Sequence, residues 1–286
     1  MKKILLTGGT GFIGKNFLNK YKNLYFFFVI LRNKKKNRKN LIKHKNIKYY
    51  FCDNNKFNKN LFKIKFDFFI NFATHYTKLN DSKNLEKIIN SNIKFPLILL
   101  NELNKLYLKK VITIGTMHEH YNNNEFFPFN LYASSKRSLE TLLEYFKKKY
   151  LNISFYNLKF YESYSDNDQR NKIIPIIKKN YHQNKRVLLS FSNLKLNFLH
   201  IDDILEAINI ILTKKIEPNS YQIKSRNFSD IRNLILEFNK KRSKKIKIKQ
   251  FRNKYPIINF KIKKLPFWKQ KNFIEKDFAR IINGKD

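Results

Sequence analysis

Cysteine is almost absent from this chain of 286 residues, whose single example is Cys52. One thiol cannot form an internal disulfide, and the sequence has no pattern of paired Cys and His residues of the kind that binds zinc. Disulfide-stabilised folds are therefore excluded, and we expect no metal site. The composition suits a reducing compartment, so we expect a cytoplasmic location.

Long apolar runs are also missing. The longest, residues 24–31, is far shorter than the roughly 20 residues that a helix needs to cross a bilayer. The first nine residues carry two lysines but no extended apolar segment or small-residue cleavage site, so they predict no export signal. We therefore expect no membrane partner. The 42% of hydrophobic residues, with 28 Phe and 16 Tyr, is nevertheless ample for a folded core.

Acidic residues are scarce relative to basic ones, with 21 Asp and Glu against 60 Lys and Arg and a net charge of +39. Such an excess can indicate a nucleic-acid surface, because clustered cations collect phosphates. Only ten of the 60 basic residues are Arg, however, and the lysines are scattered among Asn, Ile, Phe and Tyr instead of forming one tract. We therefore expect a general attraction for anionic ligands and no specific nucleic-acid partner.

Glycine is scarce as well, since the chain has only six. Four of them fall in one segment, GGTGFIG at residues 8–14, which follows an apolar strand at Lys3–Thr7 and precedes a helical pattern at residues 15–21. The early glycines permit a positive φ in a tight turn, Gly11 lets the backbone approach a pyrophosphate, and Gly14 lets the helix pack close to the strand. This arrangement predicts a dinucleotide-binding loop with the phosphates at the helix N-terminus.

Strand and helix continue to alternate along the chain. Apolar runs that resemble strands lie at residues 24–31, 47–52, 66–71, 111–114 and 153–158, separated by helical stretches such as 85–108 and 132–150. This alternation predicts an α/β fold, a Rossmann-type doubly wound parallel sheet with a smaller C-terminal substrate-binding lobe. We expect the dinucleotide-binding domain at residues 1–165, with a return segment around 196–213, and the smaller lobe at 166–195 and 214–286.

Three residues near the fifth predicted strand indicate acid–base chemistry. Tyr132 and Lys136 lie four residues apart in a helical stretch and therefore share one helix face. A phenol with a pKa near 10 is a poor acid–base group at neutral pH, and a neighbouring ammonium lowers that pKa by favouring the phenolate. Thr116 follows the strand at 111–114, at the edge where ligands bind in such sheets. The sequence thus predicts a Thr116–Tyr132–Lys136 catalytic triad.

The glycine loop is joined by three further cofactor candidates. Arg32 ends the second predicted strand, where a fold that prefers NAD usually has an acidic residue for the ribose 2′-hydroxyl. A basic residue suits a 2′-phosphate, so NADP(H) is favoured over NAD(H). Asp53, after the third strand, is an adenine contact or a helix N-cap. The predicted cofactor contacts are Gly8, Gly11, Phe12, Ile13, Gly14, Arg32, Asp53, Ala73, Tyr132 and Lys136.

With its triad and glycine loop the chain resembles the extended short-chain dehydrogenases/reductases, the NAD-dependent epimerase/dehydratase family. The likeness runs from residue 2 to about 214. Among the departures, Lys159 stands where Arg is usual, residues 162–165 replace a turn with Gly and Pro, and Asn197 replaces Asp. The resemblance implies an NAD(P)-dependent oxidoreductase acting on a nucleotide sugar. The similar segments are NFAT at 71–74, NIKFPLILL at 92–100, LKFY at 158–161 and NFLHIDD at 197–203.

The residues after Thr116 separate the reactions of that family. Dehydratases typically carry an Asp-Glu pair there, whereas Glu119 comes one position late here, so 4,6-dehydration is disfavoured. Enzymes that epimerise at C3 and C5 use a Cys and a His, and Cys52 lies far away in the sequence. The stretch at 115–121 is similar to reductases of 4-keto-6-deoxy nucleotide sugars that serve surface polysaccharide. We predict that reaction, with an NAD-dependent epimerase, or an RNA-binding or regulatory protein of the same fold, as alternatives.

Three side chains are candidate substrate contacts. His75 and His118 follow strand ends, and Arg170 lies in a polar segment where a guanidinium fork would suit the oxygens of a sugar diphosphate. The alternative for each is an incidental loop side chain. The resemblance also implies a homodimer formed through the helices at 85–108 and 132–150.

Overall fold

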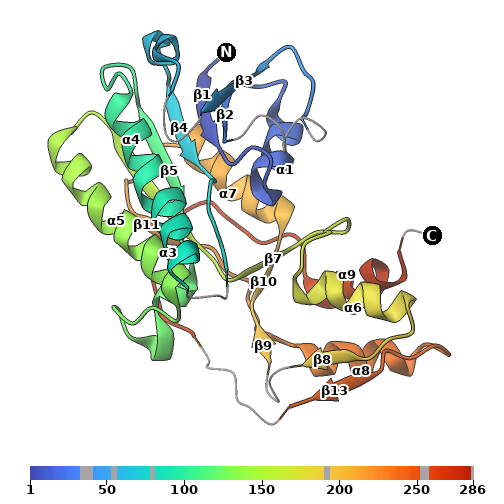
Figure 1. Ribbon diagram of the computed structural model, residues 1–286. Helices are drawn as coiled ribbons and strands as arrows, with labels where there is room; N and C mark the ends of the chain where they lie inside the picture. The colour runs from blue at the N-terminus through green and yellow to red at the C-terminus, as the bar shows by residue number, and fades with distance from the viewer. Residues whose placement is uncertain (33–40, 53–56, 78–80, 190–193, 252–257, 285–286) are drawn as a thin grey trace.

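A parallel sheet of seven strands forms the centre of the computed structural model, which describes residues 1–32, 41–52, 57–77, 81–189, 194–251 and 258–284. Its strands are β1 (Lys3–Thr7), β2 (Phe26–Arg32), β3 (Ile47–Cys52), β4 (Phe68–Asn71), β5 (Lys110–Ile114), β6 (Ser154–Lys159) and β11 (Ser220–Gln222). They lie in the order β11-β6-β5-β4-β1-β2-β3 (Figure 1). The chain therefore winds outward from β1 in one direction and from β4 in the other, which confirms the predicted doubly wound fold.

Helices cover both faces of this sheet (Figure 1). In β1, Ile4 and Leu6 join the apolar core on one face, and Leu5 joins the core on the other. Burial on both sides explains why the strands read as continuous apolar runs. One face is covered by α1 (Phe12–Tyr21) and α7 (Ile201–Thr213), and the other by α3 (Ser82–Ile89), α4 (Phe95–Glu102) and α5 (Leu131–Lys149).

The helical stretch predicted at 85–108 is interrupted. A π-helical turn, η3 (Asn90–Lys94), separates α3 from α4, and the Phe95 N–H donates to the Asn90 carbonyl across it. Pro96 accounts for the interruption, because it has no N–H to donate to the carbonyl four residues earlier. The helix ends at Glu102, where Leu103 turns to an extended conformation with ψ 145°. Irregular turns of this kind inside helices are often found at functional sites.

The remaining elements build the smaller lobe around an apolar core of its own. β7 (Glu162–Tyr164) pairs with β10 (Phe198–His200) where the two parts meet, and α6 (Ile173–His182), α8 (Ile231–Lys240) and α9 (Ile274–Asn283) pack together beyond them (Figure 1). Two further pairs are β8 (Val187–Leu189) with β13 (Ile248–Gln250), and β9 (Lys195–Leu196) with β12 (Ser229–Asp230). Short 3-10 turns are η2 (Lys59–Lys63), η4 (Met117–Glu119) and η5 (Tyr121–Asn123).

One of the predicted domain boundaries differs from the division seen in the structure. The boundary at residue 214 does not match the sheet, because β11 pairs with β6 and so belongs to the large sheet. Leu265 and Trp268 also pack on the core of that sheet. The C-terminal third therefore passes between both parts, a crossing that strand and helix periodicity does not reveal. Within the described residues, no helix has both the length and the apolar character needed to span a membrane.

Candidate active site

The glycine segment forms a tight cradle at the carboxyl end of β1. Gly8 has φ +69°, and a Cβ on it would lie 2.5 Å from the backbone of Phe72 and Ala73. A Cβ on Gly14 would lie 2.2 Å from the carbonyl oxygen of Gly8, so α1 packs against the loop at a distance that only glycine allows. The first N–H groups of a helix have no partner within it, so the start of α1 next to this cradle can donate to an anion. The cradle fits the pyrophosphate of a dinucleotide.

The cradle lies between β1 and β4, where the strand order of the sheet reverses. The Thr7 hydroxyl donates to the Asn71 amide oxygen at 2.6 Å, and the Ala73 N–H donates to the Thr7 hydroxyl at 3.2 Å. These bonds tie the two strand ends together. Ligands of open α/β sheets bind at such a switch point. The predicted loop contacts Gly8, Gly11, Phe12, Ile13, Gly14 and Ala73 thus come together in one place.

Arg32 extends from the end of β2 along the same edge of the sheet. Its guanidinium donates to the Ser91 hydroxyl and lies 5.6 Å from the centroid of the Phe95 ring. Burial lowers the pKa of this guanidinium. A cation therefore stands beside the edge at which the predicted cofactor would place its adenosine half. Asp53, the other residue named for that half, lies outside the described residues.

The three predicted catalytic residues lie on elements that are in contact. Tyr132 is the second residue of α5, whose N-terminus is capped by the Asn130 side chain accepting from the Ala133 N–H at 2.9 Å. The Lys136 Nζ lies 5.7 Å from the centroid of the Tyr132 ring, on the same helix face. Thr116 caps η4, and η4 packs against α5.

The electrostatics of this cluster differ from the expectation in one respect. Burial lowers the pKa of Lys136 to about 8, and the charge of Glu119 opposes that change. Burial also raises the pKa of Tyr132, and its hydrogen bond with Thr74 opposes the rise. The Tyr132 pKa is therefore raised and not lowered as expected, because the desolvation of the phenol is the largest contribution.

Asn92 organises the loop that follows β4. It lies in the π-helical turn, is fully buried, and uses every hydrogen-bonding position of its amide. Its oxygen accepts from the His75 N–H at 2.6 Å and the Thr74 hydroxyl at 3.1 Å, and its nitrogen donates to the His75 carbonyl at 3.0 Å and the Ser135 hydroxyl at 2.9 Å. The amide thus fixes the loop of Thr74 and His75 against α5, beside Tyr132.

Of the three predicted substrate contacts, His118 lies nearest the triad. The Thr116 Oγ1 and His118 Nδ1 atoms are 3.1 Å apart, and burial lowers the pKa of His118, which favours a neutral ring. His75 is held through its backbone by Asn92. His120, two positions further on, is buried with its ring stacked on Phe260, and burial lowers its pKa to about 4.

Arg170 stands at the glycine loop. Its guanidinium carbon lies 3.4 Å from the centroid of the Phe12 ring. The Nε and Nη2 atoms donate to the Asp168 carboxylate at 2.8 and 2.6 Å, and Nη1 and Nη2 donate to the hydroxyl and carbonyl of Ser163. Four of its five N–H groups are thus engaged. Arg170 connects the small lobe to the cradle.

Three further residues, which belong to none of the sequence motifs, lie around the triad. The Tyr76 ring packs edge-on against Tyr132, with centroids 5.1 Å apart. The Lys172 Nζ lies 5.4 Å from the Tyr76 centroid and 3.0 Å from the Glu162 carboxylate. The Glu162 charge acts on Tyr132 and on His118. Only Glu162 had a signal in the sequence, as a departure from the family turn.

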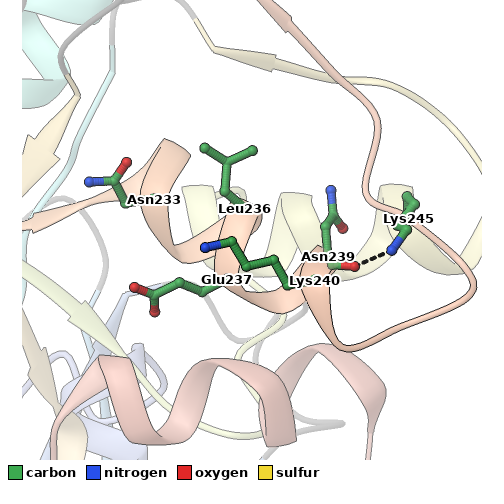
Figure 2. Close-up of a pocket in the computed structure, with 6 residues that line it drawn as sticks. All are labelled: Asn233, Leu236, Glu237, Asn239, Lys240 and Lys245. Atoms are coloured by element: carbon green, nitrogen blue, oxygen red, sulfur yellow. Dashed lines mark hydrogen bonds between the residues drawn. The ribbon is translucent and has the colours of Figure 1, made fainter.

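The surface hollow on the outer side of the small lobe is not this site. It has a volume of about 450 Å³ and lies on α8 and the chain that follows it, on elements that carry none of the predicted site residues (Figure 2). Its sides are mostly long polar side chains, and the Lys245 ammonium donates to the Asn239 carbonyl across one end. The lining residues are Asn233, Leu236, Glu237, Asn239, Lys240 and Lys245.

A glycine cradle at the switch point of a doubly wound sheet, with a Tyr-x-x-x-Lys helix beside it, defines a dinucleotide-dependent α/β oxidoreductase. The model of the NAD dependent epimerase/dehydratase family matches residues 4–223. The chain belongs to this family. The predicted family is thus confirmed, and the chain is an NAD(P)-dependent oxidoreductase of a family that acts on nucleotide sugars.

Similar proteins agree with this assignment. The chain is 31% identical over 218 residues to a CDP-abequose synthase of Yersinia pseudotuberculosis, covering 74% of this chain and 73% of the relative. It is 28% identical over 253 residues to a dTDP-D-glucose 4,6-dehydratase of Dictyostelium discoideum, covering 78% and 58%. A UDP-glucuronic acid 4-epimerase of Bacillus cereus has the same fold, with a TM-score of 0.84, 16% identity and 98% of each chain covered.

Proposed function

We propose that the chain reduces the keto group of a nucleotide-linked 4-keto-6-deoxy sugar, in deoxysugar biosynthesis for a surface polysaccharide. The observation that carries the proposal is the placement of Tyr132 and Lys136 on one face of α5, in contact with the turn that Thr116 caps. The similarity to a CDP-abequose synthase supports a nucleotide-linked deoxysugar, with a CDP-linked substrate as the first choice.

In the proposed mechanism the bound nicotinamide supplies the hydride. The Tyr132 hydroxyl gives its proton to the carbonyl oxygen of the sugar, and the Thr116 hydroxyl donates a hydrogen bond to the same oxygen. A protonated Lys136 then stabilises the phenolate that remains on Tyr132, and the same ammonium grips the nicotinamide ribose. Burial raises the pKa of Tyr132 and so keeps this phenol protonated at neutral pH, which is the form that a proton donor needs.

NADPH is the proposed reductant. Arg32 places a cation at the end of β2, where no acidic side chain competes for the ribose 2′-hydroxyl. A 2′-phosphate would replace Ser91 as the hydrogen-bond acceptor of this guanidinium.

His118, His75 and Arg170 are the proposed substrate contacts. His118 is favoured because its ring adjoins Thr116, and a neutral imidazole can donate to or accept from a sugar hydroxyl. Arg170 keeps one N–H for a diphosphate oxygen, so its larger proposed role is to hold the small lobe against Phe12. His75 belongs to the loop that Asn92 fixes, so its backbone is held in place beside Tyr132.

A homodimer in the cytoplasm is the proposed form of the enzyme. Leu85 and Ile89 on α3 and Leu142 and Tyr145 on α5 are between 40% and 60% exposed, although they are large and apolar. Side chains of this kind on neighbouring helices suit a helix-to-helix contact with a second copy. α3 and α5 contact each other within the chain.

The test is to incubate the protein with NADPH or NADH and a panel of CDP- and dTDP-linked 4-keto-6-deoxyhexoses while the nicotinamide absorbance is followed. We expect consumption of NADPH with at least one keto sugar, and none after Tyr132→Phe. Consumption by neither cofactor with any keto sugar would contradict the reductase. A tightly held NAD that survives purification, with interconversion of 4-epimers, would indicate the epimerase instead.

A further inference from the structure

A buried group of charges lies directly beneath Thr116. Glu119 is 0% exposed, and its Oε1 atom accepts the Thr116 N–H at 2.9 Å. Its Oε2 atom accepts from the Lys159 ammonium at 2.8 Å. Lys159 also lies 2.7 Å from the Glu140 carboxylate, which is 3.3 Å from the Arg137 guanidinium. Two carboxylates and two cations therefore share one enclosed place.

Gly115 shows how closely this group fits the active-site strand. A Cβ on Gly115 would lie 2.9 Å from the Lys159 Cγ and 3.0 Å from the Glu119 Oε1. The residue before Thr116 must therefore be very small for the ion pair to lie against the backbone. Lys159 is a departure from the family pattern, and Glu119 stands one position later than the acidic pair of the dehydratases; in the structure the two contact each other.

A buried ion pair is a weak device for stability, because the loss of solvation offsets much of the attraction between its charges. Its position beside a catalytic segment indicates another use. We propose that Glu119, fixed by Lys159, is a positioning residue of the reaction: it holds the backbone of Thr116 so that the Thr116 hydroxyl points at the reacting oxygen. This inference rests on the proposed function of the triad.

The same carboxylate has an electrostatic consequence for Lys136. Burial and the charge of Glu140 raise the pKa of the Glu119 carboxyl, and the Lys159 ammonium opposes the rise. Both oxygens of Glu119 accept from donors, which is the arrangement of the ionised carboxylate. Its negative charge raises the pKa of Lys136, whereas burial lowers that pKa to about 8. Lys159 pairs with both Glu119 and Glu140, and Arg137 pairs with Glu140. Loss of the Glu119 charge is thus expected to release the Lys136 proton at a lower pH.

Glu119→Gln is the main test, because glutamine keeps the size of the side chain but loses the charge through which Lys159 holds it against the Thr116 N–H. We expect kcat for the keto sugar to fall by roughly 10- to 100-fold with KM for NADPH unchanged, since misplacement of a catalytic group costs this much. The alkaline limb of the pH profile moves to lower pH. Lys159→Arg, which keeps the cation, retains most of the activity. Glu217→Gln, at the exposed pair with Lys263, is the matched control and changes neither quantity.

A second measurement does not require turnover. The fraction of Lys136 acetylated by a small excess of acetic anhydride is followed against pH by peptide mass spectrometry, and its midpoint in the wild type is expected near pH 8. The midpoint is expected to fall in Glu119→Gln and in the double variant Glu119→Gln/Lys159→Met, which leaves neither charge of the pair. An unchanged midpoint together with an unchanged kcat overturns the inference. If no keto sugar is reduced by the wild type, the proposed function fails, and the midpoint still shows whether the Glu119 charge acts on Lys136.

Discussion

The chemistry of Lys136 is set by its burial. It is 4% exposed, and burial lowers its pKa to about 8. The ammonium is therefore the main form at pH 7 and is lost as the pH rises through 8. We expect reductase activity to decline above about pH 8, because the neutral amine no longer stabilises the Tyr132 phenolate. A pH profile of kcat measures this limb, and a rate that stays level to pH 9.5 would contradict it.

Removal of the Lys136 charge is expected to stabilise the folded state. The folded-state pKa of Lys136 lies below its unfolded value near 10.4, so the buried ammonium weakens the folded state below pH 8. Lys136→Met is expected to abolish turnover and to raise the free energy of unfolding at pH 7 by at most about 3 kcal/mol. Urea unfolding at pH 7 and pH 9.5 measures the effect, which shrinks as the wild-type amine becomes neutral. A lower stability at both pH values would show that the ammonium makes a strong contact instead.

The proposed preference for NADPH rests on Arg32. Arg32→Glu is expected to raise KM for NADPH by roughly 10- to 100-fold while KM for NADH stays within a few-fold, since a charge-assisted hydrogen bond contributes about 1.5–3 kcal/mol. Arg226→Glu, a similar change of charge in the small lobe, is the control. Equal effects on both cofactors would show that Arg32 serves packing on Phe95 alone.

Contacts between individual side chains can be predicted from the sequence only where the residues are close along the chain. Tyr132 and Lys136 are one helical turn apart, so their spacing predicts their contact. Glu119 and Lys159 come from a turn after β5 and the end of β6, and nothing in either segment indicates that they meet. Tyr76 and Glu162 approach the triad from equally distant parts of the sequence. Pairs of this kind depend on the register of the whole sheet.

At the scale of elements, the start of α1 depends on one glycine. A methyl group on Gly14 would lie 2.2 Å from a backbone carbonyl oxygen of the loop, which cannot move aside as a side chain can. Gly14→Ala is expected to destabilise the protein by about 1–3 kcal/mol and to abolish tight binding of NADPH. Thermal melting and fluorescence titration with NADPH measure the two effects. Asn19→Ala, on the exposed side of the same helix, should leave both unchanged.

The regular elements were the easiest part of the fold to predict. β3 was predicted at 47–52 and is observed there, and α5 was predicted at 132–150 and spans Leu131–Lys149. The stretch at 85–108 was predicted poorly because its apolar pattern continues through the π turn that Pro96 imposes. The sequence did not predict that β11 joins the large sheet, because a strand of three residues is too short to show an alternating apolar pattern.

At the scale of the whole molecule, the exposed apolar face of α3 and α5 predicts the oligomeric state. Leu142→Asp is expected to convert a dimer into a monomer, because it places a charge in the middle of that face. Sedimentation equilibrium measures the mass of each form against the 34.8 kDa of one chain. Leu151→Asp, at a residue that is 89% exposed just after α5, is the control. A wild-type protein that sediments as a monomer would contradict the prediction.

The proposed catalytic residues and two of the residues around them come from different parts of the molecule. Thr116, Tyr132 and Lys136, together with the Glu119 and Lys159 pair beneath them, are all built on the large sheet and its helices. Glu162 and Arg170 come from the segment that leads into the small lobe. We therefore expect the proposed proton donor, Tyr132, to keep its orientation when the sequence of the small lobe changes. We expect, as a consequence, that substitutions in the small lobe can change the sugar substrate during evolution while the large sheet and its helices preserve the reaction.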